Sequence, residues 1–154
     1  MDTSVSSSPN FNVFLAAQVK GGDKGFLSKD ITVGDLISLK GDIHHLFPKD
    51  YLKKNGLQRG KYNQIANYVY MQSEINIKVG NKSPKDYFSV MRQQLTDGQL
   101  RFGGLATEAD LRANMSMNCI PESVMDMDAD SYEDFLHQRR KLMADKMKAY
   151  YHSL

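Results

Sequence analysis

Signals that start and stop helices recur along this sequence, and they constrain its fold more than any other feature. Ser or Thr stands three residues before an aspartate, the spacing of a helix N-terminal cap, at Thr32, Ser83, Thr107 and Ser131. Glycine follows the segments Val33–Leu39 and Glu74–Val79, at Gly41 and Gly80. Proline at position 48 fits the first turn of a further helix that runs to about Lys54. We therefore expect a chain built mainly from short helices.

Strand signals are few and fall in the middle of the chain. Residues 42–46 and Tyr68–Tyr70 each predict a short strand. The apolar run Phe11–Val19 fits either a strand or a buried helical turn. The expected fold class is α+β, mainly α.

Length and composition indicate one soluble domain. The chain has 154 residues, and residues 1–10 are Ser-rich and polar, so we expect a disordered tail followed by a single domain over residues 11–154. No apolar run approaches the ~20 residues of a membrane span, and no signal layout opens the chain. The single cysteine, Cys119, fits a reducing compartment, so the cytoplasm is the expected location.

Charge is unevenly distributed along the sequence. From Lys49 to Lys85 there are eight basic residues against two acids, whereas from Glu108 to Asp134 there are eight acids against one arginine. A basic segment of this kind can bind a polyanion, because Lys and Arg displace counterions from nucleic acid. The alternative is an ordinary solvated surface.

The segment Asp42-Ile-His-His-Leu-Phe-Pro48 contains the most informative residues. Two of the four histidines, His44 and His45, are adjacent, and two asparagines follow nine residues apart at Asn67 and Asn76. A strand, loop, strand, helix arrangement would bring these side chains to a common centre. Phosphodiester hydrolysis needs a base for the attacking water and a cation on the phosphate, and imidazole and amide groups can supply the base and the ligands.

These segments resemble the nuclease domain of a known family. His44-His45, Asn67 and Asn76 resemble the motif of His-Me finger (HNH) endonucleases. The stretches IHHLFP, IANYVYMQSEIN and VGNKSPKDYF are similar to the C-terminal nuclease domain of GmrSD-type restriction endonucleases. The resemblance implies a ββα-metal core surrounded by helices and a metal-dependent deoxyribonuclease that cuts foreign, phage or modified DNA.

The resemblance also implies a role for each residue of the motif. His45 would be the general base, and His44 and Asn76 would bind one divalent metal ion. Asn67 would tie the loop and orient the base. Mg²⁺ is the first expectation for the metal, but family members often carry aspartate where His44 stands, which leaves Mn²⁺ or another transition metal open.

Further residues are expected to support this site. Asp42 would fix a histidine tautomer through a hydrogen bond, and Asn63 is the weaker candidate for that role. Positively charged side chains expected to hold the DNA backbone are Lys49, Lys78 and Lys82. The family usually has a large N-terminal nucleotide-dependent half that this sequence lacks. Besides double-stranded DNA, we therefore expect a separate N-terminal subunit as partner, or a homodimer, because each single-metal site would cut one strand only.

Two other interpretations remain open at this point. The domain could be a catalytically silent DNA- or protein-binding module with a degenerate nuclease fold. It could also be an RNA nuclease, since nothing in the residues distinguishes the two substrates. Without the asparagines, the histidine pair would be read as a structural pair at a buried turn.

Overall fold

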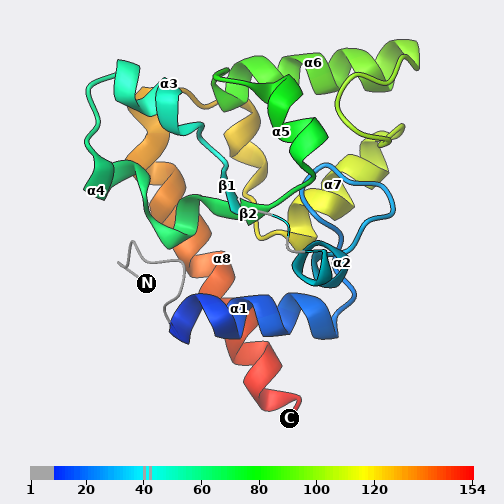
Figure 1. Cartoon of the computed structure of the whole chain (residues 1–154), viewed down its shortest axis with the longest axis vertical. Helices are drawn as coiled ribbons and strands as arrows, with labels where there is room; N and C mark the ends of the chain where they lie inside the picture. The colour runs from blue at the N-terminus through cyan, green and yellow to red at the C-terminus, as the bar shows by residue number, and fades with distance from the viewer. Residues whose placement is uncertain (1–8, 40, 42) are drawn as a thin grey trace.

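The computed structural model describes residues 9–39, 41 and 43–154, and helices form most of them (Figure 1). The α-helices are α1 (Pro9–Lys20), α2 (Val33–Ser38), α3 (Lys49–Lys54), α4 (Arg59–Tyr62), α5 (Ser73–Val79), α6 (Pro84–Asp97), α7 (Glu108–Met117) and α8 (Tyr132–His152). Short 3-10 helices are η1 (Ile65–Asn67), η2 (Glu122–Asp126) and η3 (Ala129–Ser131). With the small sheet described next, they confirm the mainly helical α+β class.

The sheet consists of β1 (Ile43–His45) and β2 (Tyr68–Tyr70), which pair antiparallel in the middle of the molecule (Figure 1). The register places His45 opposite Tyr68 and His44 opposite Val69. Beyond the strands, the backbone amide of Phe26 donates to the Tyr70 carbonyl at 2.9 Å. An early loop therefore extends the hydrogen bonding of β2, and α5 begins three residues after the strand ends.

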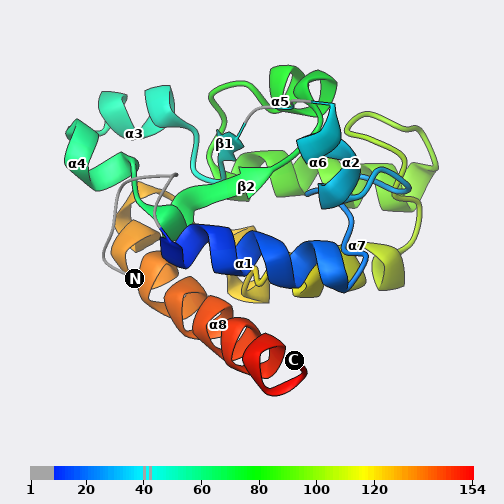
Figure 2. The ribbon, with the colours of Figure 1, turned by 60° about the horizontal axis from the view of Figure 1, so that its bottom comes forward.

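The N-terminal apolar segment is a helix. α1 begins at Pro9, so Pro9 and Asn10 belong to it and not to a tail, while residues 1–8 lie outside the described part of the chain. Figure 1 shows α1 crossing the long helix α8, Figure 2 shows the same pair from the other view, and the two helices contact each other. Phe11 and Phe14 are buried. Burial on one face at three-residue spacing explains why the segment is helical, because a strand would expose every second side chain.

Most of the expected helix ends are confirmed. The Thr32 hydroxyl accepts from the Asp35 amide and the Asp35 carboxylate accepts from the Thr32 amide, both at 3.0 Å, which is a complete capping box. Ser83 and Thr107 cap α6 and α7 in the same way with one bond each. Ser131 is the N-cap residue of α8, as expected, but its side chain makes no capping bond. The preceding helix η3 is capped by the Asp128 side chain.

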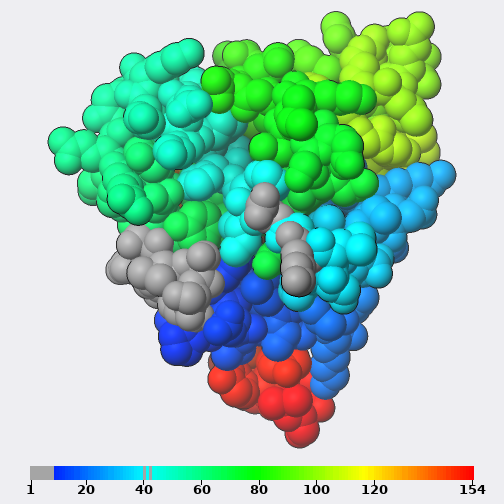
Figure 3. All heavy atoms as spheres, viewed as in Figure 1, coloured from blue at the N-terminus to red at the C-terminus, as the bar shows by residue number. Residues whose placement is uncertain are grey.

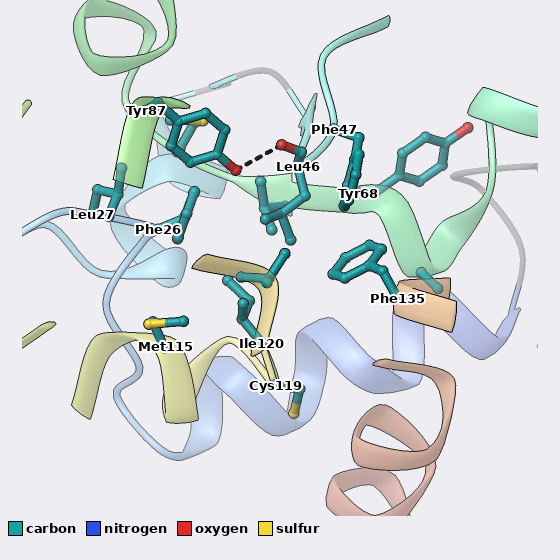
Figure 4. Packing of buried hydrophobic residues seen from close by; sticks show 14 of the residues in the cluster. Phe26, Leu27, Leu46, Phe47, Tyr68, Tyr87, Met115, Cys119, Ile120 and Phe135 are labelled. Carbon is teal, nitrogen blue, oxygen red and sulfur yellow. Dashed lines mark hydrogen bonds between the residues drawn. The ribbon is translucent and has the colours of Figure 1, made fainter. Parts of the chain in front are cut away.

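The core lies between the sheet and the surrounding helices (Figure 4). There the Tyr87 hydroxyl of α6 donates to the Leu46 carbonyl at 2.7 Å, directly after β1. Cys119 is buried in the same core, where burial raises the pKa of its thiol. Within the described residues, no helix combines the length and apolar character needed to span a membrane.

A fully buried arginine joins α8 to the segment around β2. Arg139 donates from Nη1 to the carbonyls of Ala66 and Tyr68 at 2.9 and 2.6 Å, and from Nη2 to the Asn118 carbonyl at 3.1 Å. The Phe14 ring lies 5.9 Å from its guanidinium carbon. Burial lowers the pKa of Arg139 to about 10. The side chain thus remains charged at neutral pH and holds the backbone on both sides of Asn67 in place.

Candidate active site

His44 and His45 of β1 and Asn76 of α5 line one pocket of about 220 Å³. Its other lining residues come from the start of α3 and the end of α5: Pro48, Lys49, Asp50, Gly80 and Asn81. On the face shown in Figure 3, the cyan residues of β1 lie between the turquoise residues of α3 and α4 and the green residues of α5. The structure therefore brings together the two histidines and the second asparagine, which are about thirty residues apart in sequence.

Both histidines reach this pocket because β1 ends there. Neighbouring strand residues normally point to opposite faces, and His45 is the last residue of the strand. The chain then turns: the Leu46 amide donates to the Asn67 carbonyl at 2.7 Å, and Pro48 precedes α3 with φ of −55°. His44 and His45 are each half-buried, so both imidazoles have a protein side and a pocket side.

His45 is held by a side chain from the end of α4. Its Nε2 lies 2.7 Å from Oδ1 of Asn63, and its ring packs edge-on against Tyr68 with 5.3 Å between centroids. Burial lowers the pKa of His45 below its ordinary value of 6.5, the hydrogen bond to Asn63 opposes this, and the charge of Lys49 lowers it further. A neutral imidazole at neutral pH is therefore favoured.

Asn67 is fully buried and does not line the pocket. Its Oδ1 accepts from the Phe47 amide at 2.8 Å, and its Nδ2 donates to the carbonyls of Phe47 and Tyr62, both at 3.1 Å. These bonds provide hydrogen-bond partners for backbone groups just after β1 and at the end of α4. Asn67 thus joins the chain just after His45 to the chain just before Asn63, the arrangement expected for a residue that ties the loop.

Some side chains around the pocket are of types that can bind a divalent cation. Imidazole, amide and carboxylate donors are available from His44, Asn76 and Asp50, and nitrogen and oxygen donors suit Mg²⁺, Mn²⁺ and related ions. Within residues 9–39, 41 and 43–154, no three His, Cys, Asp or Glu side chains are grouped closely enough to hold a metal. A metal here would depend on the amide as well as on the imidazole.

The expected DNA-binding lysines do not lie together. Lys49 lines the pocket, whereas Lys78 lines a separate hollow beside Leu100 and Arg101 on the other side of α5. Helix geometry explains the difference, because residues two apart on a helix, such as Asn76 and Lys78, point about 200° apart. Lys82 is exposed, with its Nζ 3.5 Å from the Lys78 carbonyl. Asp42 lies outside the described residues.

Sequence reasoning missed Asp50 and Asn81 as pocket residues. Asp50 lies in the first turn of α3, and Asn81 directly follows α5. Asn81 belongs to VGNKSP, a motif that the sequence already singled out, and Asp50 lies two residues after another such motif, IHHLFP. Asn63 was the weaker of two candidates for holding a histidine, yet it is the one whose hydrogen bond the structure describes.

Comparison with known proteins gives no further guide to this site. No protein-family model matches the chain, and neither the curated proteins nor the solved structures include a significant match.

Proposed function

We propose that this protein is a metal-dependent endonuclease that hydrolyses DNA phosphodiester bonds at the pocket of His44, His45 and Asn76. The observation that carries the proposal is the convergence of these three side chains on one pocket from two separate elements, β1 and α5. Two antiparallel strands followed by a helix are also the order of elements in a ββα-metal core. We propose that β1, β2 and α5 form such a core.

In this proposal His45 is the general base. An amide oxygen can only accept a hydrogen bond, so Asn63 Oδ1 requires the proton of His45 to be on Nε2. The lone pair is then on Nδ1, which accepts a proton from water. The water oxygen bonds to phosphorus, the bond from phosphorus to the 3′ oxygen breaks, and the departing oxygen takes a proton from solvent. The lowered pKa of His45 keeps the base neutral.

His44 and Asn76 would hold the cation, and Asp50 lines the same pocket. When bound, a divalent cation neutralises charge on the phosphate and on the departing oxygen. The other residues act by position. Asn67 keeps the loops after β1 and α4 in register, and Arg139 fixes the backbone on either side of Asn67.

The substrate and biological role rest on the sequence resemblance and on charge. Double-stranded DNA, restriction of foreign DNA, and a homodimer or a separate nucleotide-dependent subunit follow from the similarity to GmrSD-type nuclease domains. The exposed Lys49 at the edge of the pocket is compatible with a phosphate backbone.

A plasmid-nicking assay tests the proposal. Purified protein is incubated with supercoiled plasmid and Mg²⁺, Mn²⁺ or EDTA. We expect nicking with at least one metal, loss of nicking with EDTA, and a fall of at least about 10²-fold in His45→Ala, the usual contribution of a general base.

The matched control is His137→Ala, because His137 is an exposed histidine on α8 away from the pocket lining. It should nick as the unmodified protein does. Equal loss in both variants, or DNA binding without nicking under every metal, would contradict the enzyme proposal, and binding alone would favour a silent DNA-binding module. Cleavage of RNA but not of plasmid would show that the substrate is RNA and not DNA.

A further inference from the structure

The segment from α3 to the end of α4 carries a dense positive charge. We name residues 49–63 the basic lobe. It contains five basic residues and one acid, Asp50. The basic residues are all exposed: Lys49, Lys53, Lys54, Arg59 and Lys61. One of them, Lys61, approaches an acid, with 4.0 Å to Glu133 and both side chains about two-thirds exposed. Such a pair is weak in water, so the lobe keeps most of its charge.

The basic lobe borders the candidate active site on one side. Lys49 lines the pocket at one end of the lobe, and Asn63 holds His45 at the other. The Nζ of Lys49 lies 6.0 Å from the centroid of the Tyr62 ring, which links the two ends. In contrast, Lys78 of α5 points away from the pocket. The positive charge nearest to the base thus comes from α3 and α4.

Hydrogen bonds and packing hold the lobe in place before any ligand binds. The Tyr132 hydroxyl of α8 donates to the Lys61 carbonyl at 2.7 Å, and the Tyr51 hydroxyl accepts from the Ala129 amide at 2.7 Å. The Leu52 side chain of α3 is fully buried in the core. A surface that is already ordered loses little conformational entropy on binding, so these lysines form a ready platform for a charged ligand.

We propose that the basic lobe binds the phosphate backbone of double-stranded DNA on one side of the bond that is cut. The inference rests on the proposed nuclease function, and it names the surface that holds the substrate there. Charge complementarity is the reason for choosing DNA, because lysine and arginine bound to phosphates release condensed counterions. The same lobe carries Asn63, so the surface that holds the backbone also orients the base.

Salt-dependent DNA binding tests the inference. The double variant Lys53→Gln/Lys54→Gln is compared with Lys141→Gln/Lys148→Gln, which removes two exposed lysines of α8. Binding to a fluorescent duplex of about 20 base pairs is measured by anisotropy in EDTA, from about 25 to 200 mM NaCl. We expect log Kobs to fall less steeply with log salt in the lobe variant, with a slope smaller in magnitude by about 1 to 2, because each phosphate contact contributes about 0.9.

The outcomes separate the two proposals. A lobe variant with the affinity and slope of the unmodified protein overturns the lobe inference, and so does an equal effect of the α8 variant, while metal-dependent nicking would leave the nuclease proposal standing. Absence of duplex binding by the unmodified protein overturns the lobe inference as well. Nicking that persists in EDTA or in His45→Ala contradicts the nuclease proposal without affecting the binding result.

A crosslinking experiment provides a second measurement if the double variant does not fold. The native thiol, Cys119, is 6% exposed, so Lys54→Cys can carry a photoactivated crosslinker on an otherwise unlabelled protein. We expect crosslinks to labelled duplex from position 54 and not from Lys148→Cys on α8. Equal crosslinking from the two positions, or none from position 54, overturns the inference.

Discussion

His45 and Asn63 are joined by a hydrogen bond of 2.7 Å between Nε2 of the imidazole and Oδ1 of the amide. The two residues come from different elements, the end of β1 and the end of α4. The bond selects one tautomer, which leaves Nδ1 as the basic nitrogen. It also connects the proposed base to the basic lobe. A change in the pKa of His45 would therefore report a change in this contact.

We predict that the nicking rate rises with pH through a pKa below 6.5 and is flat above it. A base works in its neutral form, and burial lowers the pKa of His45. Asn63→Ala removes the hydrogen bond that raises this pKa, so the inflection should move to lower pH and the rate should fall about 10- to 100-fold. Asn63→Asp should move the inflection upward, because a carboxylate stabilises the imidazolium. Unchanged profiles in both variants would exclude Asn63 as the positioning residue.

Asn76→Ala should lose metal-dependent nicking while the protein stays folded. Asn76 is half-buried on α5 and lines the pocket, and alanine is a good helix former. The Mn²⁺ concentration for half-maximal activity should rise about 10- to 100-fold. Lys78→Ala is the matched control on the same helix, because Lys78 lines a different hollow, and its metal dependence should be unchanged. Normal metal dependence in Asn76→Ala would show that the ligand assignment is wrong.

Asn67→Ala should lower the free energy of unfolding by about 2 to 3 kcal/mol. The substitution leaves the Phe47 amide and the carbonyls of Phe47 and Tyr62 without their buried partner. Urea denaturation measures the change, and Asn63→Ala, at a half-buried position, should cost less. A variant as stable as the unmodified protein but inactive would mean that Asn67 acts in the chemistry and not through the loops.

Gly103→Ala should destabilise the fold more than Gly98→Ala. Both glycines have positive φ, 68° and 75°, so both substitutions strain the backbone. A Cβ at Gly98 would meet open space, whereas one at Gly103 would overlap the Leu27 carbonyl and lie 3.0 Å from the Ile75 side chain of α5. The difference should be about 1 to 3 kcal/mol in thermal or urea unfolding. Equal losses would indicate that the loop at Gly103 relaxes freely.

The sequence by itself determined most helix boundaries and both short strands. Capping at Thr32 and Ser83 involves a partner only three residues away. These caps therefore depend on neighbouring residues alone and can be recognised from the local sequence. The capping bond expected from the Ser131 side chain is absent. The helix η3 directly precedes α8, and there the Asp128 side chain makes the capping bond.

Only the tertiary structure decided the contacts between residues far apart in the chain. The segment Phe11–Val19 could form a strand or a helix by its sequence, and packing of α1 against α8 decides for the helix. Asn63 reaches His45 across eighteen residues, and Arg139 reaches the Ala66 carbonyl across seventy-three. Spacing in the sequence cannot predict such contacts, because they form only where burial brings separate elements together and each buried polar group requires a partner.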